Sequence, residues 1–115
     1  MGEVTVAERQ EGPVSVVVLD GELDSSTAPA VQERLAALLR PDTRTLLDLT
    51  AVPYMSSAGL RTLLLLHRNA QAVHSSVELV GVAPELRSVM EATGFLDFFT
   101  VSDSVSEALP GAGAS

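Results

Sequence analysis

Two adjacent serines, Ser56 and Ser57, are the residues whose position in this sequence suggests chemistry. They follow a short apolar run with one acid, 46–49, and precede a leucine-rich run, 60–73. This order predicts a strand, a turn and the start of a helix. A serine there can cap the helix by accepting a backbone N–H bond, and the same N–H groups and the positive dipole end also favour a phosphate. The segment therefore predicts either a helix cap or a site for a phosphate group.

Other polar residues could support different chemistry. Glu22, Asp24 and Asp48 are expected to cluster at one end of the sheet, and we interpret them as a solvated loop and turn. Metal binding is the weaker alternative because their spacing matches no diagnostic pattern. His67 and His74 lie seven residues apart, so we expect one partly buried and one exposed histidine rather than a catalytic or zinc site. A Gly-x-Ser-x-Gly turn and a phosphate-binding Gly-rich loop are absent from the sequence. We expect a binding protein without a cofactor, not an enzyme.

The composition limits the class of protein. The 115 residues are 46% hydrophobic but only 3% aromatic, which predicts one domain with an aliphatic core. Cysteine is absent, and seven arginines against fifteen acids give a formal charge of −8. This charge disfavours nucleic acid and membrane surfaces as partners and suits a protein that binds a basic partner. No leader or bilayer-spanning run is evident, so we expect a cytoplasmic protein.

Strands and helices alternate along the chain, which predicts an α/β fold with a mixed central sheet and about four helices. We expect strands at Val4–Ala7, Val14–Leu19, Thr45–Leu49, Val77–Val80 and Phe99–Val101. We expect helices from Thr27 to about Leu39, from Ala58 to Val73, from Pro84 to Thr93, and a short one ending at Leu109. Residues 1–109 would form one domain, and residues 110–115 a disordered tail.

Three details of these elements can be predicted from single residues. Residues 21–26 are expected to form a loop, because no alternating partner strand follows the Asp20-Gly21 pair. Gly94 is expected to end the third helix at positive φ, with Phe95 making the hydrophobic contact of a Schellman motif. Ser102 or Asp103 is expected to cap the last helix.

Several short motifs, in this order, resemble the STAS domain of anti-sigma-factor antagonists. The resemblance covers about residues 4–109, and its ordered combination is more specific than any single motif. The motifs are Leu19-Asp20-Gly21-Glu22-Leu23-Asp24, Leu47-Asp48-Leu49-Thr50, Met55-Ser56-Ser57-Ala58-Gly59-Leu60, Leu79-Val80-Gly81-Val82 and Thr93-Gly94-Phe95-Leu96-Asp97.

The resemblance implies a partner switch. In this family the unmodified protein binds an anti-sigma factor that is also a serine kinase, and so releases a sigma factor. Phosphorylation of a serine two residues before the motif glycine ends the binding, and a serine phosphatase reverses it. Counting from Gly59, that serine is Ser57, with Ser56 as second choice. The family's Asp before the acceptor is replaced here by Ser56, and Ala58 follows in place of Ser or Thr.

A docking surface for the kinase is expected where these loops converge at one end of the sheet. An alternative remains: a STAS scaffold subunit of a signalling or lipid-transport assembly, with Ser57 acting only as a helix cap. An enzyme ranks third. The residues expected in the docking surface are Glu22, Asp24, Ser25, Ser26, Thr27, Tyr54, Met55, Ser56, Ser57, Ala58, Gly59 and Arg61.

Overall fold

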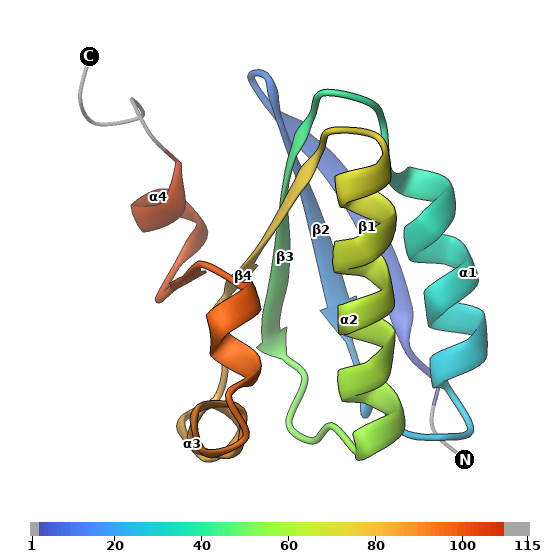
Figure 1. The fold of residues 1–115 in the computed structure, drawn as a ribbon, viewed down its shortest axis with the longest axis vertical. Helices are drawn as coiled ribbons and strands as arrows, with labels where there is room; N and C mark the ends of the chain where they lie inside the picture. Colours follow the sequence, from blue (N-terminus) through green and yellow to red (C-terminus); the bar gives the residue numbers. More distant parts are fainter. Residues whose placement is uncertain (1–2, 110–115) are drawn as a thin grey trace.

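A five-stranded sheet in the order β1-β2-β3-β4-β5 organises the computed structural model, which describes residues 3–109 (Figure 1). β1 runs antiparallel to β2, and the other neighbouring pairs are parallel. The expected mixed sheet is therefore confirmed. The strands are β1 Thr5–Glu11, β2 Val14–Asp20, β3 Arg44–Ala51, β4 Ser76–Val80 and β5 Val101–Ser102.

Helices pack on both faces of the sheet, and α1 and α2 lie side by side along one of them (Figure 1). α4 covers the opposite face near β3 and β5. The helices are α1 Ala28–Leu38, α2 Ser57–Ala72, α3 Pro84–Ala92, the 3-10 helix η1 Phe95–Phe98, and α4 Val105–Ala108. The positions of the four α-helices follow the prediction.

The core follows from the alternation of side chains along the central strands. Val17, Leu19 and Leu47 belong to the larger cluster, under α1 and α2, whereas Val16 and Leu46 belong to the smaller cluster, under α4. All five are almost fully buried. Apolar residues on both faces explain why β2 is a nearly continuous valine run, as expected for a strand covered on two sides.

Three local predictions need correction. β1 continues beyond Ala7 to Glu11, because its polar second half still pairs in full with β2. The expected strand Phe99–Val101 is displaced to Val101–Ser102, since residues 95–98 form η1. α4 is capped by neither Ser102 nor Asp103 but by Ser104, whose Oγ accepts a 3.1 Å bond from the Glu107 N–H. The tail predicted at residues 110–115 lies outside the described residues.

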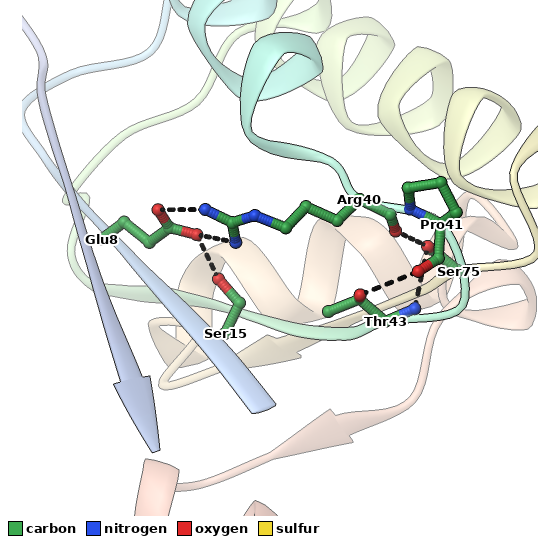
Figure 2. A network of polar contacts seen from close by, with 6 residues as sticks. All are labelled: Glu8, Ser15, Arg40, Pro41, Thr43 and Ser75. Atoms are coloured by element: carbon green, nitrogen blue, oxygen red, sulfur yellow. Dashed lines mark hydrogen bonds and ion pairs between the residues drawn. The ribbon is translucent and has the colours of Figure 1, made fainter. Parts of the chain in front are cut away.

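A polar network joins the edge strand to the segments that follow α1 and α2 (Figure 2). Glu8 on β1 accepts bonds from the Ser15 hydroxyl at 2.6 Å and from Arg40 at 2.8 and 3.3 Å. The carbonyl oxygen of Arg40 accepts a bond from Ser75 Oγ, which itself accepts from the Thr43 N–H at 3.2 Å. The hydrogen bond from Arg40, followed by that from Ser15, lowers the pKa of Glu8 below its usual value.

Candidate functional site

Two loops at the carboxyl ends of β2 and β3 are joined directly beside the start of α2. Leu23 and Met55 form an isolated parallel bridge. The Leu23 N–H donates to the Tyr54 carbonyl at 3.0 Å, and the Ser56 N–H donates to the Leu23 carbonyl at 2.9 Å. Both bridging side chains are buried. The loop at residues 21–27 is therefore fixed against the turn that leads to the serines. The loop and the turn can thus form one surface, which the resemblance implies.

Gly59 allows this close approach. A Cβ at this position would lie 2.5 Å from Met55 Cγ and 2.7 Å from the Leu23 carbonyl oxygen. Such distances are well inside van der Waals contact, and the carbonyl is held by the bridge. Gly59 is thus required by packing rather than by its backbone angles, because it lies within α2.

The two serines have opposite environments. Ser56 precedes α2 in extended conformation, and its Oγ is buried without a hydrogen-bond partner among the described residues. Ser57 is the first residue of α2, is exposed, and makes no side-chain hydrogen bond within residues 3–109. Interpreting Ser57 as a helix cap is therefore wrong, because the N-cap position belongs to Ser56, and that side chain makes no capping bond either.

Asp24 organises the other loop. Its Oδ1 accepts bonds from the Ser26 hydroxyl at 2.7 Å, the Ser26 N–H at 2.9 Å and the Thr27 N–H at 3.2 Å. These bonds, the Ser26 hydroxyl first, lower the pKa of Asp24. Thr27 is buried and its hydroxyl donates to the Glu22 carbonyl at 2.9 Å. The loop is therefore held in one conformation immediately before α1.

The expected cluster of Glu22, Asp24 and Asp48 is not formed. Asp48 on β3 accepts bonds from the Thr50 hydroxyl at 2.6 Å and the Thr50 N–H at 2.9 Å, so it stabilises the end of its own strand. Within residues 3–109, no three acidic or histidine side chains are grouped as metal ligands would be. Asp24 and Asp48 each serve a local turn instead.

The predicted docking residues divide into a surface and its support. Tyr54 is 52% exposed, and Glu22, Ser25, Ser26, Ser57 and Arg61 are also exposed. Thr27, Met55 and Gly59 are buried, so they position the surface without being available to contact a partner. A shallow groove of about 230 Å³ between the starts of α1 and α2 brings Ser25, Ala58 and Arg61 together.

The histidines occupy the environments predicted for them. His67 is partly buried, with its ring centroid 5.3 Å from that of Phe99 and 6.0 Å from that of Phe98. His74 is exposed just after α2 and has positive φ. Neither contacts the serine turn in the described structure, so both lie outside the candidate site.

The leucine run on α2 is only partly core. Leu63 and Leu66 are buried, but Leu64 and Leu65 remain half-buried, although Leu64 still packs against the core. Four consecutive helical residues span more than a full turn, so they cannot all face the sheet. This pattern is the sequence signal of an apolar surface on α2 that does not face the sheet, although the sequence alone favours core for the whole run.

Comparison with known proteins agrees with this architecture. The model of the STAS domain family matches residues 5–108. The chain is 30% identical to the anti-sigma-B factor antagonist of Listeria monocytogenes over 105 residues, covering 90% of this chain and 91% of that protein. It is 36% identical to BtrV of Bordetella bronchiseptica over 90 residues, covering 77% and 78%.

A solved structure gives the same result for the fold. The crystal structure of an anti-sigma factor antagonist from Mycobacterium paratuberculosis superposes with a TM-score of 0.79 at 26% identity, covering 91% of this chain and 90% of that one. Anti-sigma factor antagonists are regulators that act without enzymatic activity. Within residues 3–109, no helix is both long and apolar enough to cross a bilayer. By the extent of the family match and the identity to these relatives, the chain belongs to the STAS-domain family of anti-sigma factor antagonists.

Proposed function

We propose that this protein is the antagonist in a partner switch. Its unmodified form binds an anti-sigma factor with serine kinase activity and so releases a sigma factor. Phosphorylation of Ser57 ends that complex, and a serine phosphatase restores it. The observation that carries this proposal is the position of Ser57, which is exposed, makes no side-chain hydrogen bond to another described residue, and begins α2 beside the fixed loop.

Access favours Ser57 over Ser56 as the phosphate acceptor. A kinase must reach the hydroxyl oxygen, and the Oγ of Ser56 is buried. The side chain of Ser57 is exposed at the positive end of the helix dipole. Ser56 replaces the aspartate expected before the acceptor, and we propose that this change alters kinase recognition while Ser57 remains available.

The added phosphate would act on the interface rather than on the fold. It carries about −1.5 to −2 charges at neutral pH, and the first turn of a helix favours such a charge by some tenths of a kcal/mol. On the docking surface it adds negative charge and bulk beside the loop that carries Glu22 and Asp24. A loss of about 3 kcal/mol would lower partner affinity by roughly a hundredfold.

Charged groups on the same surface would position the partner. Arg61 offers a forked donor to a carboxylate of the kinase, and Asp24 offers an acceptor to a basic group. Reversing either charge is expected to weaken kinase binding without unfolding the protein, because both side chains lie at the surface loop or on the exposed side of α2.

The test is a binding titration of the cognate anti-sigma factor kinase, with and without ATP. Unmodified protein and Ser57→Ala should bind equally well without ATP, and ATP should release only the unmodified protein. Ser57→Asp should keep the fold and bind poorly. Ser56→Ala is the matched control and should be released by ATP like the unmodified protein.

Intact mass identifies the modified site in the same samples. One added phosphate on the unmodified protein and on Ser56→Ala, but none on Ser57→Ala, would support the switch. Tight binding of Ser57→Asp together with normal release of Ser57→Ala would reject it. No phosphate under any condition, including on protein purified from its own cells, would favour the alternative of a scaffold subunit.

A further inference from the structure

A second groove lies further along α2, on its outward side. It has a volume of about 440 Å³, and Leu64, Leu65 and Phe98 supply its apolar surface. Arg61 and Arg68 also line it, and no carboxylate does. Arg61 is its only residue shared with the shallow groove beside Ser57.

Two elements, α2 and η1, supply the apolar side chains of this groove. On α2, the positions i, i+3, i+4 and i+7 are held by Arg61, Leu64, Leu65 and Arg68. This spacing places all four side chains on one face of the helix. Phe98 comes from η1 and is 52% exposed, although its ring packs edge-on against His67 at 6.0 Å. An exposed aromatic ring supported in this way resembles the anchors found at protein interfaces.

The groove carries positive charge, whereas the protein as a whole is negatively charged. The protein has a formal charge of −8, and five of its seven arginines are engaged within residues 3–109. Arg9, Arg40, Arg44 and Arg87 form ion pairs with Glu11, Glu8, Glu78 and Asp103, and Arg34 donates to the Val6 carbonyl. Arg61 and Arg68 are the two arginines without an ion pair or hydrogen bond in the described structure, and both line this groove.

We propose that this groove docks an acidic amphipathic helix of a partner protein. Apolar side chains of that helix would cover Leu64, Leu65 and Phe98, and carboxylates would pair with Arg61 and Arg68. The two arginines are seven residues apart, which places them about 10 Å apart along the axis of α2. Acids two turns apart on the partner helix match this separation, and two unpaired guanidinium groups can each hold a carboxylate with two hydrogen bonds.

The proposal is independent of the partner switch at Ser57. The acidic surface around the groove would repel a large acidic partner. Only an acidic segment small enough to fit the groove would therefore gain from pairing with the two arginines. Electrostatic complementarity of this kind mainly sets specificity and association rate, while the apolar contacts supply affinity.

The experiment uses a synthetic helical peptide of about 15 residues, with a leucine stripe and flanking glutamates two turns apart. A second peptide carries lysines in place of the glutamates. Binding is followed by NMR chemical shifts of the full-length protein and by calorimetry. The glutamate peptide is expected to shift residues 61–71 and Phe98, and to bind at least about tenfold more tightly than the lysine peptide.

Variants separate this groove from the kinase surface. Arg68→Glu and Phe98→Ala should each weaken peptide binding about tenfold or more, a loss typical of a central interface contact. Arg87→Glu makes the same charge change on α3 and should leave it unchanged. Ser57→Ala, which cannot be phosphorylated and adds no charge beside Arg61, should also bind the peptide normally, so a failed partner switch would not affect this result.

Three outcomes would overturn the proposal. These are shifts elsewhere on the protein, equal binding of the glutamate and lysine peptides, or unchanged binding by Arg68→Glu. Sedimentation provides a further check: dimerisation of the protein alone, abolished by Arg68→Glu, would show that a second copy of the chain occupies the groove and not an acidic partner helix.

Discussion

Ser57 and Arg61 are four residues apart on α2, so their side chains extend over the same side of the helix. Arg61 has no ion pair in the described structure, and it lines both grooves on α2. A phosphate on Ser57 would provide an anion at the favourable i, i+4 separation. The modification would then place its charge beside an arginine that is available in the unmodified protein.

Gly59→Ala tests how tightly the site is packed at the level of one residue. The added methyl would meet a backbone carbonyl at 2.7 Å and Met55 Cγ at 2.5 Å. Overpacking of this kind costs about 1–3 kcal/mol, against a gain of about 1 kcal/mol in helix propensity. We expect a net loss in the free energy of unfolding, measured with urea, and a displaced loop at residues 21–27 with weaker kinase binding.

Asn69→Ala is the matched control, because Asn69 is exposed on the same helix. It should gain helix propensity without any steric contact and should be at least as stable as the unmodified protein. A Gly59→Ala protein as stable as this control would show that the approach of α2 to Leu23 is looser than the distances imply.

At the scale of elements, the end of α3 depends on a left-handed residue. Gly94 has φ of 75°, as the sequence predicted, and its N–H donates to the Glu91 carbonyl at 3.2 Å. Met90 and Phe95 on either side of the turn are both buried. A Cβ at Gly94 would meet only Asp97 Oδ2, at 3.7 Å, so the restriction comes from the backbone and not from space.

Gly94→Val should therefore lower the free energy of unfolding by roughly 1 kcal/mol or more, because a β-branched residue is strained at positive φ. Gly94→Asn is the control and should lose less, since asparagine tolerates this conformation. Thermal and urea unfolding measure both changes. Equal stability of Gly94→Val and the unmodified protein would mean that α3 ends in another way in solution.

The elements with strong apolar patterns were predictable, and those defined by long-range contacts were not. Val14–Leu19 was recognisable as a buried strand because each of its apolar side chains faces one of two cores. η1 was missed, and the last strand was predicted to begin at Phe99, because that buried aromatic residue is typical of a strand, whereas in the fold it directly follows η1. The Leu23–Met55 bridge has no local signal, since it joins two loops that are distant in the sequence.

The candidate site was also predictable only in part, because some of its features follow from local pattern and others from long-range contacts. The start of α2 follows from local pattern, so the serine could be located from the sequence. The burial of Ser56 Oγ depends on its position beside Leu23, whose carbonyl accepts the Ser56 N–H. No spacing rule shows such an arrangement, and the capping interpretation failed at that point.

At the scale of the whole molecule, the network around Glu8 connects parts of the chain that are remote from the serine turn (Figure 2). β1 is an edge strand held to β2, and the ion pair with Arg40 fastens it to the segment that follows α1. Ser75 connects that segment to the loop after α2. The sheet edge, α1 and α2 are thereby held at the end of the fold opposite the site.

The same network should make stability depend on pH. Hydrogen bonds from Arg40 and then Ser15 lower the pKa of Glu8 in the folded protein below its ordinary value of about 4.5. A lowered carboxyl pKa means that the unfolded chain takes up a proton more readily than the folded one. The stabilisation from Glu8 is therefore present above about pH 4.5 and is lost as the pH falls through the folded pKa.

Glu8→Gln is expected to lower the free energy of unfolding at neutral pH. Below about pH 4.5, where the unmodified protein loses the charged pair, the free energy of unfolding of the variant should fall less steeply with decreasing pH. The remaining acid sensitivity would include that of Asp24, whose pKa is also lowered. Glu33→Gln, on the exposed side of α1, is the matched control and should leave the pH profile unchanged. Urea unfolding at neutral and acidic pH measures all three proteins, and parallel profiles for Glu8→Gln and the unmodified protein would show that the network does not stabilise the charged form of Glu8.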